Sequence, residues 1–305
     1  MQRYLDPIND VAFKRIFKAK DKLLDFLNAT LINIIESKII SLDFLPTEEI
    51  PDIRQGKRSF FDLKVKDETG KIYIIEMQNS YDRYFLNRVQ YYGSHTLASQ
   101  LKIGDEYDGA IPIIVVSVLN HSLFNNDIPC ISYHTTREKE TNQCHLFLLS
   151  YVFIELTKFT KTEAELSSNL DEWLYFLSKS PNATDIPTNI KDKIVISAYK
   201  EIERFNWSEE QYDAYIRAGM MMGAERIRDE DNFEKGLKEG TEKGLKEGVE
   251  KGLKEGVEKG LKEGEKQTKI TTAKKMLENN IDLNIISSCT GLTPKEIKNL
   301  KKDQE

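Results

Sequence analysis

The spacing of apolar residues along the first 160 positions predicts a chain that alternates between helices and strands. Leucines and isoleucines that recur three and four residues apart predict an amphipathic helix, and short β-branched runs predict strands. The predicted elements are, in order, a helix at 21–37, strands at 60–66 and 71–78, a helix at 81–101, and strands at 112–119 and 145–156. The apolar run at 112–119 has the pattern of a buried central strand.

This order of elements predicts an α/β fold, in which a mixed central sheet is flanked by helices. Beyond residue 160 the pattern is helical, and from Gly236 to Gly264 a glycine occupies every fourth position. The cause is an octad repeat, read as GLKEGTEK, GLKEGVEK, GLKEGVEK and GLKEGEKQ. We therefore divide the chain into a core (1–160), a helical extension (161–232), the octad repeat (233–265) and a small basic helical unit (266–305).

The octad repeat can form a helix or a flexible charged linker. Each glycine costs a helix about 1 kcal/mol relative to alanine, whereas a Glu-to-Lys pair four residues apart contributes only about 0.2–0.5 kcal/mol. An isolated helix is therefore marginal, and a partner helix would stabilise it. The apolar residues beside the glycines also recur every fourth position, a period above 3.6 that favours a right-handed supercoil. We expect a homo-oligomer formed through the repeat, with the linker as the alternative.

Charge and composition narrow the classes of function. The 305 residues include 44 Lys and Arg against 50 Asp and Glu, and a net charge of −6 excludes a globally basic nucleic-acid binder. Three widely spaced cysteines favour a reducing compartment over a disulfide framework, so we expect a cytoplasmic protein. The sequence lacks an apolar run of about 18 residues and an apolar leader. We therefore expect no membrane span and no signal peptide.

The most informative segment is the hairpin predicted over residues 60–78. The loop at 68–70 ends with Gly70, which suits the left-handed position of a three-residue hairpin turn. This turn pairs Asp67 with Lys71 and so sets the register of the two strands.

In this register the two strand faces differ in character. One face carries polar side chains, namely Asp62, Lys64, Glu76 and Gln78. The other face is apolar and carries Phe61, Leu63, Val65, Tyr73, Ile75 and Met77. A register shifted by one residue would mix the two sets, so the clean separation supports the pairing.

The polar face brings Asp62 directly opposite Glu76, with Cβ atoms roughly 5 Å apart. Two such carboxylates repel each other unless a cation lies between them. Mg²⁺ or Mn²⁺ is a good candidate, because hard cations take oxygen ligands and accept water and phosphate as further ligands. Gln78 can position a water molecule or a phosphate oxygen, and Lys64 can supply charge. The alternative is an ordinary solvent-facing hairpin whose lysines neutralise its acids.

Several blocks of the sequence, taken in order, resemble one known family. They are DPINDVAFKRIF at 6–17, the acid Asp62, IEMQNS at 75–80, the segment from FLNRVQYY to IIVVSVL at 85–119, the Gly-rich repeat, and AKKMLENNIDLNIISSCTGLTPKEIKNL at 273–300. Together these blocks resemble the recombination-promoting nuclease and putative transposase family of the PD-(D/E)XK nuclease superfamily.

The resemblance implies a restriction-endonuclease-like core that cleaves DNA phosphodiesters with Mg²⁺ or Mn²⁺. Asp62 and Glu76 would be the metal ligands, and Gln78 would take the place of the superfamily's lysine. Because an amide cannot carry charge, this departure leaves the activation of water unassigned. Lys64 completes the expected catalytic set. The Pro51-Asp52 dipeptide looks like the superfamily's name but precedes the hairpin, so we do not assign it to the site.

Five further residues are candidates for contact with DNA. Lys14, Arg83 and Arg88 could meet phosphate oxygens. Asp10 could be aimed at the site by an N-terminal helix, with a solvated or capping role as the alternative. Tyr91 lies one turn from Arg88 on the same predicted helix.

Two interpretations of function remain open from the sequence. The first is a metal-dependent DNA endonuclease in recombination, mobile-element biology or defence against foreign DNA. The second is a catalytically weak or inactive scaffold that keeps the fold, binds DNA or protein and self-associates through its repeat. The acidic net charge favours the second, since affinity for DNA comes largely from phosphate neutralisation. The resemblance favours the first. The basic end of the chain, 266–305, reads as a helix-turn-helix or as a docking hairpin.

Overall fold

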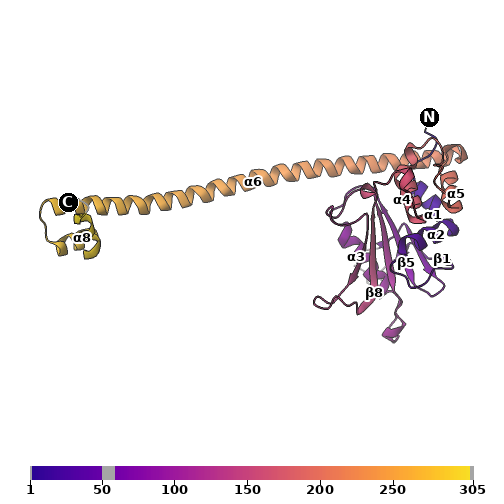
Figure 1. The fold of residues 1–305 in the computed structure, drawn as a ribbon, viewed down its shortest axis with the longest axis horizontal. Coiled ribbons are helices and arrows are strands. Elements are labelled where there is room, and N and C mark those ends of the chain that lie inside the picture. Colours follow the sequence, from indigo (N-terminus) through magenta and orange to yellow (C-terminus); the bar gives the residue numbers. More distant parts are fainter. Residues whose placement is uncertain (1, 50–58, 303–305) are drawn as a thin grey trace. The chain divides into compact units, whose positions relative to one another are not determined.

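The computed structural model describes residues 2–49 and 59–302 (Figure 1). It divides into two compact units, Met1–Asp229 and Glu230–Glu305, which are described separately below. The Pro51-Asp52 dipeptide lies outside the described residues. Among the residues that are described, no helix combines the length and the apolar character needed to cross a bilayer.

A six-stranded mixed sheet forms the centre of the first unit. Its strands are, in spatial order, β1 (Leu42–Phe44), β4 (Leu63–Asp67), β5 (Ile72–Gln78), β6 (Ile113–Leu119), β8 (Leu146–Glu155) and β7 (Ile131–Thr136). Strands β5, β6 and β8 are parallel neighbours, and the remaining pairs are antiparallel. The predicted strands at 71–78, 112–119 and 145–156 correspond to β5, β6 and β8. The sequence analysis did not find β1 and β7.

A separate two-stranded ladder joins β2 (Glu48–Glu49) to β3 (Ser59–Phe60). The α-helices of the chain are α1 (Asp10–Phe17), α2 (Lys20–Leu31), α3 (Phe85–Ala98), α4 (Asn169–Lys179), α5 (Lys193–Glu201), α6 (Glu209–Glu278), α7 (Leu283–Thr290) and α8 (Pro294–Lys302). Short 3₁₀ turns occupy Tyr107–Gly109, Leu156–Lys158, Glu163–Glu165, Ser180–Asn182 and Arg204–Asn206. The predicted helix at 21–37 therefore ends at Leu31, six residues early.

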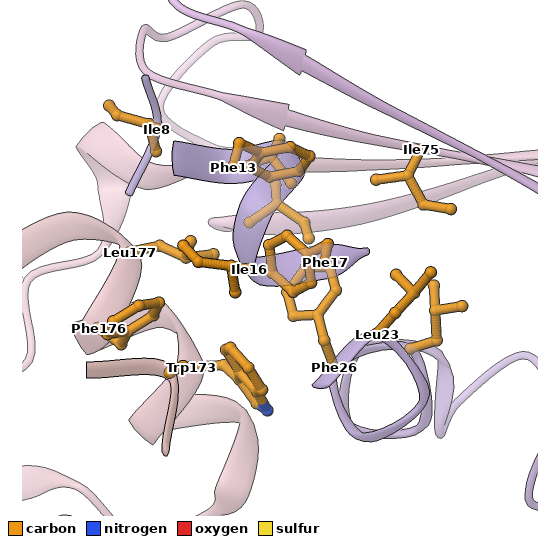
Figure 2. Close-up of a cluster of buried hydrophobic side chains, with 14 of the residues drawn as sticks. Ile8, Phe13, Ile16, Phe17, Leu23, Phe26, Ile75, Trp173, Phe176 and Leu177 are labelled. Atoms are coloured by element: carbon orange, nitrogen blue, oxygen red, sulfur yellow. The ribbon is translucent and has the colours of Figure 1, made fainter. Parts of the chain in front are cut away.

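Helices cover both faces of the sheet, as Figure 1 shows for α3 on one side and α1, α2, α4 and α5 on the other. The larger core lies under the second group (Figure 2), where aromatic rings of α1, α2 and α4 meet. The ring of Phe17 lies 4.9 Å from that of Phe26 and 5.6 Å from that of Trp173. The indole N–H of Trp173 donates a 2.7 Å hydrogen bond to Asp25, so the polar atom of this buried ring is hydrogen-bonded.

The smaller core lies between the sheet and α3. Phe85 and Val89 of α3 pack here against Ile74 of β5 and Val115 of β6. In β6 the two cores take alternate residues, because successive side chains of a strand point to opposite faces. The face toward α3 is also the face of Glu76 and Gln78, which alternate with the residues of the larger core. The candidate site therefore belongs to the α3 side.

The hairpin register is confirmed over most of its length. Leu63 pairs with Ile75, the backbone N–H of Asp67 donates to the carbonyl of Lys71, and Gly70 has φ +89°. These are the pairing and the left-handed turn that the sequence predicts.

The first predicted strand, however, is not continuous. The chain bends at Asp62, between β3 and β4, and Phe60 pairs with Glu48 rather than standing opposite Gln78. Just before the bend, Phe61 joins the core under α3, where its ring meets Tyr92 at 5.2 Å. The prediction that Phe61 shares a face with Leu63 was therefore wrong, because the alternation does not continue through a bend.

The end of the chain forms the core of the second unit. Ala273 of α6, Ile286 of α7 and Ile297 of α8 are buried together. Asp282 caps α7 by accepting from the N–H of Asn284, and Gly291 ends that helix with φ +70°, a left-handed position that suits glycine. The expectation of short helices at this end is therefore confirmed.

The octad repeat lies within α6, whose bounds include residues 233–265. Its leucines and valines are exposed, with 55–69% of each side chain accessible from Leu237 to Leu261. Self-association through this stripe, and the division of the chain at 160, 232 and 265, stay predictions. Helices α4 and α5, which belong to the predicted extension, pack in the same core as α1 and α2.

Candidate active site

The central residue of the site is Glu76, two residues before the end of β5. Parallel pairing with β6 places it beside Ser117, and only 6% of the residue is exposed. Its Oε1 atom and the Ser117 hydroxyl are buried and have no hydrogen-bond partner among the described residues. Burial, followed by the charge of Asp62, raises the pKa of Glu76 to about 8. Glu76 is thus a buried carboxylate that lacks a neutralising contact at one oxygen.

Asp62 reaches the same region from the bend before β4. Its Oδ2 accepts a 2.8 Å hydrogen bond from the backbone N–H of Met77, the residue that follows Glu76. Its Oδ1 lies 3.3 Å from the Nζ of Lys14. Burial raises the pKa of Asp62, against the opposing effects of the Met77 amide and the Lys14 charge. The bend that interrupts the predicted strand is therefore what turns this carboxylate toward the backbone of β5.

The first helix contributes a cation to this edge of the site. Asn9 caps α1 by accepting from the N–H of Val11, and one turn later Lys14 points to Asp62. The same ammonium lies 2.7 Å from Asp10, so Lys14 joins the two carboxylates. The structure therefore places Asp10 and Lys14 near Asp62, with Asp10 paired to Lys14, and their proposed contact with DNA stays a prediction.

Gln78 is tied to helix α3 rather than exposed at the end of β5. Its Oε1 accepts a 2.7 Å hydrogen bond from Nη2 of Arg88, and its Nε2 donates to the carbonyl of Ser80. Nη1 of Arg88 pairs with Asp82 at 2.8 Å. Gln78 and Asp82, on either side of the turn after β5, thus hold the guanidinium on the Glu76 side of the sheet.

The remaining sequence candidates lie around this centre with different surroundings. Lys64 is buried on β4, with its Nζ 5.6 Å from the centre of the Phe61 ring. Arg83 packs over the ring of Tyr84 and donates to its hydroxyl. Tyr91 is exposed on α3 and stacks on His95 at 5.8 Å.

Sequence reasoning missed two residues that the structure brings into the site. Ser117 is the single polar residue in the apolar run at 112–119, a signal that could have marked it. Asp82 had no such signal, because its importance comes from the pairing of this residue, which precedes α3, with Arg88 in the first turn of that helix.

A cleft opens beside the site, where β5 and β6 end. Ligands in α/β sheets bind at the carboxyl ends of parallel strands, which is where this cleft lies. Its volume is about 480 Å³. The lining residues are Asp6, Asn9, Asn79, Ser80 and Asn120, with Tyr215, Ile216, Gly219, Met220 and Gly223 from α6. Asn79, the residue after Gln78, is part of its wall, whereas Asp62 and Glu76 are not among the lining residues.

The donor set fits a hard divalent cation. Among the described residues no group of three or more His, Cys, Asp or Glu side chains is arranged to hold a metal ion. Asp62 and Glu76 nevertheless offer two carboxylates whose charges repel each other, and Oε1 of Glu76 has no hydrogen-bond partner in the described part of the chain. Mg²⁺ keeps several waters and binds through one or two carboxylates plus substrate phosphates, so a two-carboxylate site is sufficient. We therefore find that the residues present fit Mg²⁺ or Mn²⁺.

Comparison with known proteins gives one positive result. A family model described as PD-(D/E)XK nuclease family transposase matches residues 7–221. The matched segment contains the sheet, the helices α1 to α5 and every candidate residue of the site. No curated protein and no solved structure matches the chain.

Proposed function

This chain belongs to the PD-(D/E)XK nuclease family of transposases, and from that premise we propose that it is a metal-dependent DNA endonuclease. The family implies a phosphodiester hydrolase that acts on DNA in transposition. The finer proposal is hydrolysis of DNA with Mg²⁺ or Mn²⁺, in recombination, mobile-element biology or defence. We also propose that residues 1–160 form a restriction-endonuclease-like core.

One observation carries this proposal. The carboxyl group of Asp62, partly buried at the bend before β4, lies close enough to the buried Glu76 of β5 that its charge raises the pKa of Glu76. Lys14 contacts Asp62, but Oε1 of Glu76 has no hydrogen-bond partner among the described residues, and a buried carboxylate in its ionised form requires a partner or a metal. An edge hairpin that merely faces solvent would not bury its acids in this way.

Each residue of the pair has a distinct part in the proposed reaction. Oδ2 of Asp62 accepts the hydrogen bond of the Met77 amide, so Oδ1 is the oxygen that would bind a cation after Lys14 is displaced from it. Glu76 presents Oε1 from a central strand and would hold the cation together with Asp62. The chemistry that a divalent ion would supply there is a lower pKa for bound water and neutralisation of charge on the phosphate. Ser117 beside Glu76 can hydrogen-bond to a water or to the carboxylate.

The test is cleavage of supercoiled and linear DNA with Mg²⁺ or Mn²⁺. The shape-preserving variants Asp62→Asn and Glu76→Gln should each lose activity by several orders of magnitude. The matched controls Asp127→Asn and Glu140→Gln change the same groups at exposed loop positions and should cut like the wild type. Equal cutting by all five proteins would exclude this site as the source of activity.

A non-catalytic scaffold is the second candidate function, and Gln78 is the observation that favours it. The family's lysine position carries a neutral amide, so the charge expected there has to come from elsewhere. Calorimetric titration with Mn²⁺ separates the two functions. Binding by the wild type that is lost in Asp62→Asn supports the nuclease, and no binding by either supports the scaffold.

We propose, in addition, that the chain forms a homo-oligomer through the octad repeat. The support is the exposed apolar stripe from Leu237 to Leu261, flanked by Glu and Lys side chains that can pair with a second copy. Analytical ultracentrifugation of the full chain should show an oligomer that dissociates when residues 236–259 are deleted. A monomer at all concentrations would favour the linker.

A further inference from the structure

Gln78 occupies the position at which the superfamily has a lysine, so the positive charge of that lysine is absent here. The hydrogen bonds of Gln78 show which residues surround its amide group. The amide oxygen accepts from Arg88 at 2.7 Å, while the amide nitrogen donates to the Ser80 carbonyl at 2.9 Å. These two bonds fix which end of the amide faces α3. An exposed glutamine in an ordinary hairpin would have no reason to be oriented at both ends.

Arg88 is held on several sides and still has donors to spare. Asp82 binds Nη1 at 2.8 Å, Gln78 binds Nη2, and the guanidinium carbon lies 5.3 Å from the centre of the Phe85 ring. A guanidinium has five N–H donors, and these bonds use two of them. The side chain is 35% exposed, so Arg88 is accessible from solvent.

Arg88 and Lys14 are described cations that reach the region of the two carboxylates, Arg88 through its bond to Gln78 and Lys14 through its contact with Asp62. Lys14 lies between two carboxylates, at 2.7 Å from Asp10 and 3.3 Å from Asp62, so two negative charges neutralise its positive charge. Arg88 has one carboxylate partner, Asp82, and Gln78 adds no charge. The guanidinium is therefore the better source of positive charge for a phosphate.

We propose that Arg88, oriented by Gln78, contacts the scissile phosphate and supplies the positive charge that position 78 itself lacks. This inference rests on the proposed nuclease function. Arg88 is the residue that touches substrate, and Gln78 is a positioning residue that acts through it. The planar fork of arginine suits two oxygens of one phosphate, which a lysine at position 78 would meet as a point charge.

The experiment compares four variants of the full chain with the wild type. They are Arg88→Ala, Gln78→Ala, Gln78→Lys combined with Arg88→Ala, and Arg137→Ala as a control that removes an exposed arginine after β7. Two readouts are taken for each protein: steady-state cleavage with Mg²⁺, and binding of a short duplex with Ca²⁺ by fluorescence anisotropy. Thermal unfolding establishes that each variant is folded.

The expected losses follow from the strength of a charge-assisted hydrogen bond. Arg88→Ala should lower kcat/KM and affinity for the duplex by about 10- to 100-fold. Gln78→Ala should lower kcat more than the affinity for the duplex, because Arg88 remains but is no longer held in its orientation by the amide. The double variant should recover most of the loss of Arg88→Ala, since a lysine at position 78 restores charge on the same face. Arg137→Ala should match the wild type.

The outcomes distinguish this inference from the proposed function. If the wild type cuts and Arg88→Ala cuts and binds equally well, the inference is overturned while the nuclease stands. A loss in Arg88→Ala that the added lysine does not recover would make Arg88 structural and also overturn it. If the wild type binds but does not cut, while Arg88→Ala binds weakly and the double variant recovers, the nuclease fails and the phosphate contact stands. If the wild type neither cuts nor binds, both fail.

Discussion

The substitution Glu76→Gln tests whether a carboxylate is buried without compensation in the metal-free protein. Glutamine keeps the shape of the side chain and removes the charge. Because burial and Asp62 raise the pKa of Glu76 from 4.5 to about 8, the folded protein resists its ionisation. The stability that this protonated group contributes is fully present below pH 4.5 and is lost as the pH rises through about 8. The stability of Glu76→Gln relative to that of the wild type should therefore increase as the pH rises.

The magnitude follows from the two pKa values, at about 1.4 kcal/mol for each unit of difference. The wild type should be less stable than Glu76→Gln by about 1 kcal/mol at pH 5 and by about 3 kcal/mol at pH 7. A difference of about 3 kcal/mol corresponds to roughly 6–12 °C in Tm for a unit of this size.

Tryptophan fluorescence in a chelating buffer is the appropriate assay. Both tryptophans, Trp173 and Trp207, lie in the first unit, so their signal reports its unfolding. Glu140→Gln, at an exposed position, is the control and should follow the wild type at every pH. Adding Mn²⁺ should then raise the Tm of the wild type and leave that of Glu76→Gln unchanged, because ligand binding to the folded state stabilises it. Equal stability of wild type and variant from pH 5 to pH 8 would refute the reasoning.

Three further predictions concern other parts of the chain. Lys14→Met removes the cation that contacts Asp62, so the affinity for Mn²⁺, measured by calorimetry, should rise several-fold. Unchanged or weaker binding would contradict a competition between the lysine and the metal. Trp173→Phe removes the hydrogen bond to Asp25 and ring volume from the larger core. It should lower the free energy of unfolding, measured by urea denaturation, by about 2–4 kcal/mol. A loss below about 1 kcal/mol would show that the core repacks. Gly291→Ala places a side chain at φ +70° and should speed amide hydrogen exchange in α7 and α8 by about tenfold, with no change at α3.

The sequence was informative where structure is local. The turn at 68–70, with its left-handed glycine, was predicted because three neighbouring residues set it, and the register of β4 on β5 followed. The buried run of β6 was likewise clear from its apolar residues alone. By contrast, β1 and β7 escaped notice because short strands at the sheet edge are defined by their partners and have little periodicity of their own.

The candidate site shows the same division. Alternation along two strands was enough to single out Asp62 and Glu76 as neighbours, and their roles as ligands stay a prediction. Alternation failed at Phe61, since the bend at Asp62 moves that ring to the core under α3. The bend itself has no local signature that the sequence analysis could use.

By itself the sequence determined the chemistry that is available: two acids on a polar strand face, an amide where a lysine is expected, and cations on the neighbouring helices. Only the tertiary structure decided how they combine. It placed Lys14 of α1 on Asp62 and Arg88 of α3 on Gln78, contacts between elements from opposite faces of the sheet. The physical reason is that periodicity fixes the face to which a side chain points, whereas the packing of helices on the sheet fixes what it meets there.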